Sequence, residues 1–138
     1  MSAVSKEYKI GEGNQIGFLP TEFGASGQIL EKTIKAGVDI LKGQVVELTD
    51  ALTVAPTSAA SANVLGVAMF DAKAGEAVAI ETEGLFKLTA VSAITAPAQV
   101  ESAADGKVAT KGGTVVKIIG IAITDASTDG DVYVKFSV

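Results

Sequence analysis

The tripeptide Gly66-Val67-Ala68, inside the apolar run at residues 64–69, is the stretch of sequence that decides the fold. It returns further along the chain as Gly120-Ile121-Ala122, again inside an apolar run. A short, nearly continuous apolar run bounded by turn residues is typical of a strand that is buried on both faces. Because two such runs share one tripeptide, we expect the chain to contain two related β units.

Matches on both sides of the tripeptide extend this repeat. At the same spacing, Val54-Ala55 matches Val108-Ala109, and Asp71-Ala72 matches Asp125-Ala126. With a one-residue insertion, residues 75–80 align with 130–135, and Gln44-Val45 aligns loosely with Gln99-Val100. The repeat therefore predicts units at about 42–84 and 97–138. Two copies are too few for a solenoid, so we expect a closed structure in which each unit helps to cover the other.

Other short segments also carry strand patterns. Residues 132–138 alternate apolar and polar side chains with the period of a half-buried strand, and similar signals occur at 44–48, 52–54, 77–82, 85–88 and 117–123. Residues 51–62 are rich in alanine and could form a helix, but Pro56 and the Ser and Thr content favour a loop. The predicted fold is all-β: a small pseudo-duplicated β-barrel or β-clip body, resembling a β-tulip, at residues 28–138.

The segment at residues 1–27 differs from this body. Five glycines and Pro20 interrupt it, which is incompatible with a helix, and no regular alternation is present. Apolar side chains are nevertheless spaced along the segment: Ile10, Ile16, Phe18, Leu19 and Phe23. Disordered segments are usually poor in such residues. We therefore predict an extended N-terminal arm at residues 1–27 with these five side chains as binding anchors; a frayed terminus is the alternative.

Composition excludes several classes of function. The 138 residues include no histidine and no cysteine, all 11 basic residues are lysine, and the formal net charge is −5. Disulfides, cysteine-ligated zinc and catalytic relays that use histidine or cysteine cannot be built. An acidic chain is a poor ligand for nucleic-acid phosphates, and no apolar run is long enough to span a membrane. The start lacks the pattern of a secretory signal, and the absence of cysteine fits a cytosolic origin.

The carboxylates do not assemble a recognisable site. Asp71 and Asp125 precede glycines in predicted turns and are expected to bond backbone amides there. Glu81 and Glu83 are two apart, which places them on one wet face of a strand. Residues 128–131 resemble a fragment of a calcium loop, but the full 12-residue pattern is missing. We predict no catalytic, metal-binding or cofactor-binding residue, and we expect no enzyme activity.

The ordered series of motifs resembles the capsid decoration, or cement, proteins of tailed phages. The similar segments are Ala36-Gly37 followed by Gly43-Gln44-Val45-Val46, then Gly66-Val67-Ala68 followed by Ala74-Gly75-Glu76-Ala77-Val78, then Gly84-Leu85-Phe86-Lys87-Leu88, and finally residues 119–138. The resemblance covers about 28–138. Residues 99–105 depart from it, because they lack the aromatic residue expected in the second "Gly-Asp-x-Val-Tyr" strand.

The resemblance implies a structural protein of the virion. Such proteins are made in the host cytoplasm, bind the major capsid protein on the outer surface of the capsid, often as homotrimers, and stabilise the shell without turnover. A second hypothesis is a phage fibre, tail or surface-adhesin module that uses the same β body on a receptor or glycan. A third is a small hydrolase that relies on carboxylates alone.

Overall fold

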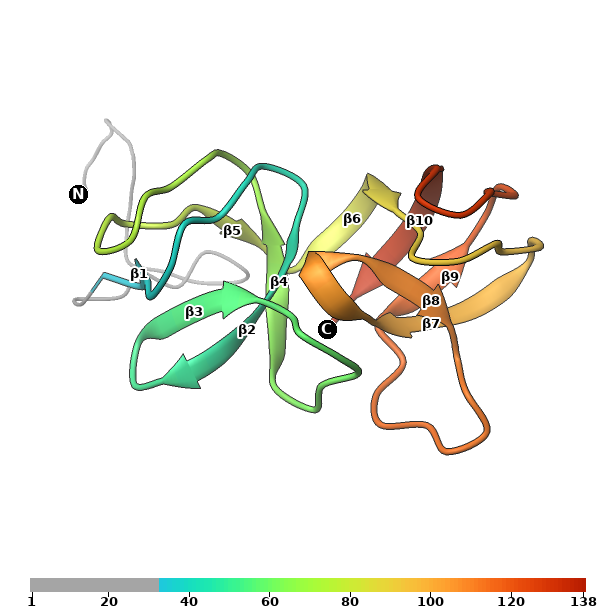
Figure 1. Cartoon of the computed structure of the whole chain (residues 1–138), viewed down its shortest axis with the longest axis horizontal. Helices are drawn as coiled ribbons and strands as arrows, with labels where there is room; N and C mark the ends of the chain where they lie inside the picture. The colour runs from blue at the N-terminus through green and yellow to red at the C-terminus, as the bar shows by residue number, and fades with distance from the viewer. Residues whose placement is uncertain (1–32) are drawn as a thin grey trace, which may run out of the picture. The chain divides into compact units, whose positions relative to one another are not determined.

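Strands account for nearly all the regular structure of the chain. The computed structural model describes residues 33–138, and within them it contains ten β-strands, one 3-10 helix at Ala104–Gly106 and no α-helix (Figure 1). Residues 34–138 form one compact unit. The all-β prediction is therefore confirmed, whereas the anchors Ile10, Ile16, Phe18, Leu19 and Phe23 lie outside the described residues.

The first of two five-stranded sheets has the order β1-β3-β2-β4-β5. Its strands are β1 (Lys35–Ala36), β2 (Val45–Asp50), β3 (Thr53–Pro56), β4 (Val64–Ala68) and β5 (Ile80–Glu81). β1 runs parallel to β3, and the remaining neighbours are antiparallel. An isolated bridge between Lys35 and Ala77 brings the start of β1 back to the segment before β5, so the sheet curls toward closure.

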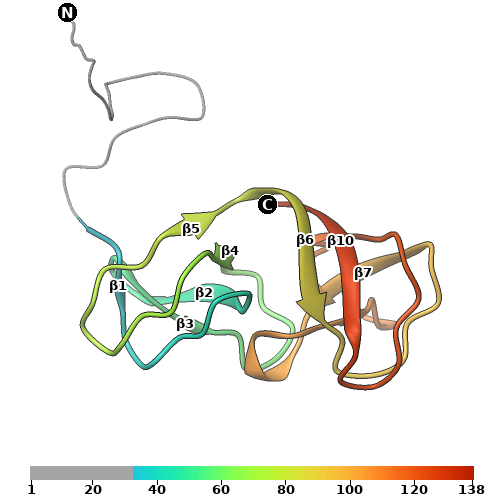
Figure 2. The same cartoon turned by 90° about the horizontal axis from the view of Figure 1, so that it is seen from above.

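The second sheet has the order β6-β10-β9-β7-β8. Its strands are β6 (Glu83–Thr89), β7 (Ala98–Ser102), β8 (Val108–Thr110), β9 (Gly120–Ala122) and β10 (Asp131–Ser137). β6 and β10 pair along their whole length, and Figure 2 shows them side by side. All neighbours in this sheet are antiparallel, and a parallel bridge from Ala90 to Val108 curls it in the same way as the first.

The two sheets repeat the same contacts at the spacing of the repeated tripeptide. Ile40 and Ala72 exchange backbone hydrogen bonds of 2.8 and 2.9 Å, and their counterparts Ile94 and Ala126 exchange bonds of 2.9 and 3.0 Å. The strand registers repeat as well: β4 pairs with β5 through Val67 and Glu81, and β9 pairs with β10 through Ile121 and Lys135. The two sheets are therefore structural counterparts at these positions.

The insertion expected from the sequence is wrong. The amide of Gly75 donates to Ala36, and the amide of Asp129, not Gly130, donates to Ala90. Both donors have positive φ, 89° for Gly75 and 60° for Asp129. Aspartate is among the few non-glycine residues that tolerate this left-handed conformation. The sequence alignment matched glycine with glycine, whereas the backbone keeps its shape and accepts aspartate at that turn.

The match of Gln44-Val45 with Gln99-Val100 is also off by one position, because it too followed identical letters and not the backbone. Val46 pairs with Gly66 in the first sheet, and Val100 pairs with Gly120 in the second, so Val46 and Val100 are counterparts. The recurring contacts also begin before residue 42, since the Lys35–Ala77 bridge corresponds to the Thr89–Asp131 pair. The boundary between arm and body at residue 28 remains a prediction.

Several strand bounds differ from the sequence expectation. β7 and β8 form in the region where an aromatic residue was missing, because Val100 and Val108 fill the core there without one. The strand expected at 77–82 shortens to Ile80–Glu81. Ala77 makes only an isolated bridge, so the described residues give this segment no continuous partner on its outer edge. Residues 51–62 contain β3 and turns but no helix, as predicted.

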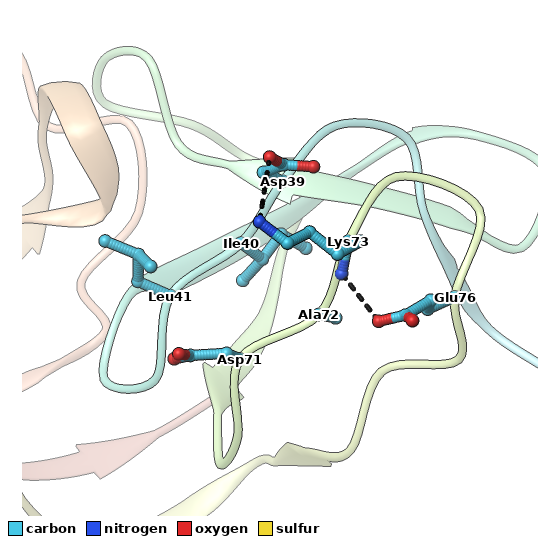
Figure 3. Close-up of a pocket in the computed structure, with 7 residues that line it drawn as sticks. All are labelled: Asp39, Ile40, Leu41, Asp71, Ala72, Lys73 and Glu76. Carbon is cyan, nitrogen blue, oxygen red and sulfur yellow. Dashed lines mark hydrogen bonds and ion pairs between the residues drawn. The ribbon is translucent and has the colours of Figure 1, made fainter.

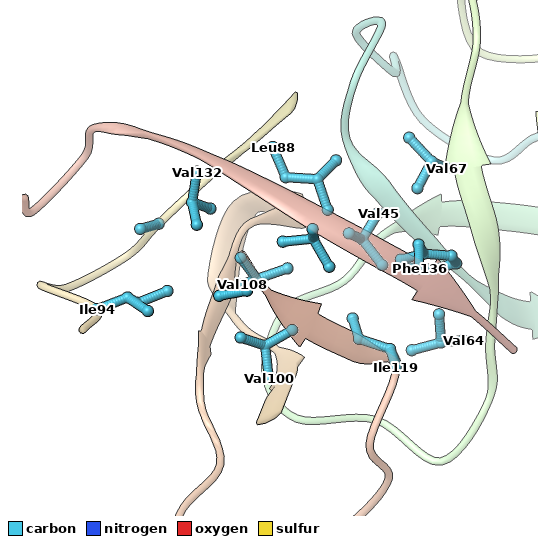
Figure 4. Close-up of a cluster of buried hydrophobic side chains, with 13 residues drawn as sticks. Val45, Val64, Val67, Leu88, Ile94, Val100, Val108, Ile119, Val132 and Phe136 are labelled. Carbon is cyan, nitrogen blue, oxygen red and sulfur yellow. The ribbon is translucent and has the colours of Figure 1, made fainter. Parts of the chain in front are cut away.

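The core consists of two clusters of buried side chains. The smaller lies within the first sheet and is built from Ala36, Ile40, Val46, Val54, Ala68 and Ala72. The larger, shown in Figure 4, contains the counterparts of the first five residues and is extended by Leu88, Ile119 and Phe136, while Ala126, the counterpart of Ala72, packs against it. Val45, Val64 and Val67 of the first sheet also belong to the larger cluster. The outer face of the first sheet is therefore buried against the core of the second.

Hydrogen bonds complete this joint between the sheets. The hydroxyl of buried Thr57 donates to the carbonyl of Ala103 at 2.8 Å, and the hydroxyl of Ser102 donates to the carbonyl of Ala59 at 2.9 Å. The side-chain amide of Gln44 donates to the carbonyl of Asp105 at 3.1 Å. Because buried polar groups are costly unless they are paired, these bonds fix the sheets in one arrangement.

Candidate binding surface

A small hollow at the end of the first sheet gathers several charged side chains. It has a volume of about 160 Å³ and is lined by Asp39, Ile40, Leu41, Asp71, Ala72, Lys73 and Glu76 (Figure 3). Three carboxylates around one cavity is a pattern that acid–base or metal chemistry would need. Their partners decide whether they are available for such chemistry.

Each carboxylate already binds the protein itself. Asp71 Oδ1 accepts the amide of Lys42 at 2.8 Å, and Glu76 Oε1 accepts the amide of Lys73 at 2.8 Å. Asp39 Oδ1 accepts the amide of Ala74 at 3.0 Å, while its Oδ2 lies 3.7 Å from the ammonium of Lys73. The hollow is a network that stabilises two loops, and in residues 33–138 no three potential ligands are grouped as a metal would require.

The second sheet repeats the central bond of this network. Asp125 Oδ1 accepts the amide of Ala96 at 2.8 Å, as Asp71 does with Lys42, and the two bonds span the same distance along the chain. The two aspartates were expected to bond amides in their own turns. They instead tie each turn to a loop that lies well before it in the sequence. That contact depends on tertiary structure, so the local turn pattern could not show it.

The segment that resembled a calcium loop also has an internal partner. Asp129 Oδ1 lies 2.9 Å from the ammonium of Lys107. This hydrogen bond, together with the nearby charges of Asp129 and Asp105, raises the pKa of Lys107 above its ordinary value despite the opposing effect of desolvation. Asp129 therefore acts as a contact between the segment that leads into β8 and the turn before β10.

Large apolar side chains are exposed on the outer face of the second sheet and directly after β9. Leu85, Ile121, Ile123 and Tyr133 are 62, 45, 50 and 47% exposed. The register places them on one face, since Leu85 and Ile121 both lie opposite Lys135, and the Ile123 amide donates to the Tyr133 carbonyl. Lys87 and Lys135 share this face with Glu83 and Asp131, and the ammonium of Lys87 lies 3.9 Å from Asp131, so the face carries charges of both signs.

The corresponding face of the first sheet is covered. Val67, the counterpart of Ile121, is only 2% exposed, because the second sheet packs on it. Sequence analysis missed the exposed face as a candidate surface. The alternation at residues 132–138 contained a signal, because it places Tyr133 on the face opposite Val132 and Val134. Whether such a face is covered depends on a neighbouring sheet, which the alternation does not report.

No helix in the described part of the chain is long and apolar enough to cross a bilayer. The predicted arm residues Ile10, Ile16, Phe18, Leu19 and Phe23 are not described by the structure, so their role stays a prediction. The described contacts identify one face of the body with exposed apolar side chains and assign the carboxylates of the hollow to loop stabilisation.

Comparison with solved structures identifies a similar fold in a phage particle. The crystal structure of the N base of the head fiber protein gp8.5 from bacteriophage phi29 matches with a TM-score of 0.57. The match covers 77% of this chain and 92% of the phi29 chain at 14% sequence identity. At this identity the likeness concerns the fold alone. A comparison with curated protein sequences gives no significant match.

Comparison with protein families gives a match in sequence. The profile of a family described as phage cement protein matches residues 24–137, which is most of the chain. The match includes both sheets and begins just after Phe23. The chain therefore belongs to the phage cement protein family, a group of structural proteins of bacteriophages.

Proposed function

We propose that this protein binds the outer surface of a phage capsid and stabilises the shell. Family membership over residues 24–137 is the observation that carries the proposal. The body suits the role, because two curled sheets joined by a shared core and buried hydrogen bonds give a rigid unit. The net charge of −5 favours solubility on a surface that faces outward. The role requires binding and no turnover.

The contact with the major capsid protein is assigned to residues 1–27. A glycine-spaced segment can add a strand to an exposed sheet edge, where backbone hydrogen bonds give affinity and side-chain pockets give specificity. Ile10, Ile16, Phe18, Leu19 and Phe23 are the side chains proposed to enter such pockets. A homotrimer would present three arms at once, so that weak individual contacts gain from effective concentration.

The test uses purified protein and shells assembled from the major capsid protein of the same phage. We expect the full chain to decorate the shells in electron micrographs and to raise the temperature at which they open. Deleting residues 1–27, or combining Phe18→Ser with Phe23→Ser, should abolish decoration while leaving the body folded. Phe70→Ser is the matched control, because Phe70 is a phenylalanine of the body that is 68% exposed.

Three outcomes would change the proposal. Full decoration by the truncated chain would refute the role of the arm. Loss of decoration on changing Ile121 and Tyr133 to serine, with the arm variants still binding, would move the contact to the exposed face of the second sheet. Sedimentation equilibrium tests the trimer, and a monomer at micromolar concentration would remove the multivalent part of the mechanism.

The likeness to the phi29 head fiber base favours one alternative: a module at the base of a fibre, or another receptor-binding module of the particle. Such a module would bind host cells or glycans and would leave the stability of bare shells unchanged. Binding of the labelled full chain to host cells, without decoration of shells, would select this alternative.

A further inference from the structure

The joint inside the chain has an uncovered equivalent on the second sheet. Val45 and Val67 are paired on β2 and β4, and both are buried against the core of the second sheet. Gln99 and Ile121 occupy the same places on β7 and β9, in the same register, and both are exposed. Within residues 33–138 nothing covers this second pair, so the surface that docks inside the chain recurs without a partner.

The loop that takes part in the joint is repeated as well, and Figure 1 shows the two copies as the connections β3–β4 and β8–β9. In the first loop, the amide of Ser58 donates to Glu47 at 3.3 Å. In the second, the amide of Gly112 donates to Glu101 at 3.2 Å, at the same spacing along the chain. The first loop also bonds to the second sheet, whereas the described bonds of the second loop stay within its own sheet.

Residues that meet in the joint have counterparts that differ in matched pairs. The amide of Ser61 donates to the hydroxyl of buried Ser102 at 2.9 Å. The counterparts of these two serines are Val115 and Leu48, which are both apolar and both exposed. Both sides of this contact have therefore changed from polar to apolar, so that the two exposed side chains would suit each other if they met.

A second contact shows the opposite exchange. Val45 and Phe136 belong to the same buried cluster, shown in Figure 4. Their counterparts Gln99 and Thr82 are polar and exposed. Both sides have changed from apolar to polar, and an amide and a hydroxyl can hydrogen-bond to each other. The two surfaces again remain complementary.

A third contact exchanges the size of the side chains. A Cβ at Gly106 would lie 2.6 Å from the Cβ of Gln44, so the joint requires glycine there. The counterparts are Leu52 and Ala98, so the large side chain has moved to the opposite surface. Leu52 keeps the positive φ of Gly106, 50° compared with 68°, and its side chain is exposed. Because Leu52 has a Cβ, its contact with Ala98 requires wider spacing than the joint inside the chain.

The rim of the joint has counterparts of opposite charge. Inside the chain, the hydroxyl of Thr57 donates to the carbonyl of Ala103 at 2.8 Å. The counterpart of Thr57 is Lys111, and that of Ala103 is Thr49, which Asp50 follows. An equivalent contact between two copies would bring the Lys111 ammonium close to the Asp50 carboxylate. Charges at an exposed rim add little affinity, but they favour the correct partner and register.

We propose that a second copy of this chain docks head to tail on the first, through an equivalent of the joint inside the chain. The donor surface lies on β7, β9 and the loop before β9, and consists of Ala98, Gln99, Val115 and Ile121. The receiving surface lies on the first sheet of the next copy, and consists of Leu48, Leu52 and Thr82. A second copy is the occupant because both surfaces belong to this chain and their residues differ from those of the internal joint in matched pairs.

A head-to-tail contact uses a different surface on each of the two partners, so copies either close into a ring or extend into a filament. A ring of three would satisfy both this contact and the homotrimer of the proposed function. The number three rests on the proposed function, whereas the interface rests on the internal repeat. The experiments use the isolated full chain without shells, so failure of the interface and failure of capsid binding are separate results.

Mixing two defective variants tests the direction of the contact. Ile121→Asp breaks the donor surface, and Leu52→Asp breaks the receiving surface. Both side chains are exposed, and aspartate tolerates the positive φ at position 52, so both variants should fold. Each alone should sediment as a monomer, with the dissociation constant raised at least about a hundredfold, because burial of an unpaired carboxylate is costly. An equimolar mixture should form one-to-one dimers and nothing larger, because one intact donor and one intact receiving surface remain.

Tyr133→Asp is the matched control for the donor variant. Tyr133 lies on the same exposed face, but its counterpart Ala79 stays exposed beside the joint inside the chain. This variant should therefore assemble as the unmodified chain does. The proposal is overturned if the unmodified chain is a monomer at micromolar concentration, if it assembles while the mixture stays monomeric, or if Tyr133→Asp blocks assembly as strongly as Ile121→Asp.

A charged pair tests one of the matched contacts directly. Val115→Lys or Leu48→Glu alone should weaken assembly at least about tenfold, because each places a charge against an apolar side chain. Both changes in one chain should restore assembly, because the lysine of one copy then meets the glutamate of the next. Sedimentation equilibrium measures all three variants. A double variant that assembles no better than the single ones would show that positions 115 and 48 do not meet, and would overturn the interface.

Discussion

The two sheets share one set of backbone contacts but differ in what covers them. The first has a small core of alanine, valine and one isoleucine, and its outer face is buried by the second sheet. The second has a larger core that includes Leu88 and Phe136, and its outer face carries exposed Leu85, Ile121 and Tyr133. The two sheets thus share hydrogen-bond contacts, while their side chains differ according to whether the outer face is covered.

The aromatic pair of the second sheet illustrates this difference. Phe86 and Phe136 meet edge to face with ring centroids 5.9 Å apart, and Figure 4 shows Phe136 near the valines contributed by the first sheet. The counterpart of Phe136 in the first sheet is Thr82, which is exposed. No further sheet packs on this side of the first among the described residues, so a polar side chain at position 82 avoids exposing apolar surface.

The largest predicted effect comes from removing the aromatic residue at the joint. Phe136→Ala should lower the free energy of unfolding by about 3–5 kcal/mol, because it leaves a cavity in a fully buried site. Thr82→Ala, at the counterpart position, should change it by less than about 0.5 kcal/mol, because Thr82 is exposed. Urea unfolding followed by fluorescence or circular dichroism measures both. Equal losses would show that the two positions are not specialised as described.

The glycines of the repeated tripeptide should behave alike. A Cβ at Gly66 would lie 2.4 Å from the Glu81 carbonyl oxygen, and one at Gly120 would lie 2.5 Å from that of Lys135. Changing either glycine to alanine should therefore cost about 1–3 kcal/mol through forced separation of the strands.

Gly113→Ala is the control for these variants, because a Cβ there has no neighbour within 4 Å. Thermal unfolding of the three variants checks the expectation. If Gly66→Ala left the melting temperature unchanged while Gly120→Ala lowered it, the strands of the first sheet would be able to move apart where those of the second cannot.

The paired aspartates should contribute nearly equal, smaller amounts. Asp71→Ala and Asp125→Ala each remove one hydrogen bond to a backbone amide, and each should cost about 0.5–1.5 kcal/mol. Asparagine at either position keeps an acceptor oxygen and should restore part of the loss. Denaturant midpoints of the four variants measure this. A loss at only one of the two positions would show that the repeated bonds carry unequal weight.

The smallest effect concerns a contact that the first sheet lacks. The bond to Asp129 raises the pKa of Lys107, so its stabilisation is complete below the unfolded-state pKa of about 10.4 and is lost as pH rises through the higher folded-state pKa. Asp129→Asn should lower the melting temperature slightly near neutral pH and remove this part of the alkaline decline. Asparagine tolerates the φ of 60° at this position. An unchanged alkaline profile would contradict the assignment.

The fold could be predicted from the sequence where the pattern is local. The alternation at 132–138 gives β10, and the apolar run at 64–69 gives β4, because burial of one or both faces of a strand imposes the spacing of its own residues. β7 and β8 were harder, since small aliphatic residues fill their part of the core and no aromatic residue marks them. The short β5 depends on partners that lie elsewhere in the chain.

In the candidate sites, too, local patterns could be predicted and long-range contacts could not. Sequence patterns indicated that Asp71 and Asp125 bond backbone amides, but not that the amides belong to Lys42 and Ala96. They indicated a repeat, but an alignment that favours identical letters introduced an insertion that the backbone does not contain. Positive φ at both Gly75 and Asp129 shows that the repeated quantity is the turn, which two different residues can adopt.

The sequence by itself determined the all-β class, the spacing of the repeat and the absence of histidine and cysteine chemistry, because composition and alternation are properties of neighbouring residues. Only the tertiary structure decided which outer face is buried, how the sheets join and which loops the aspartates hold. Val67 and Ile121 occupy equivalent places in equivalent strands, yet one is buried and the other exposed. The difference arises from the neighbouring sheet that packs on Val67, and that packing is a non-local choice of partner.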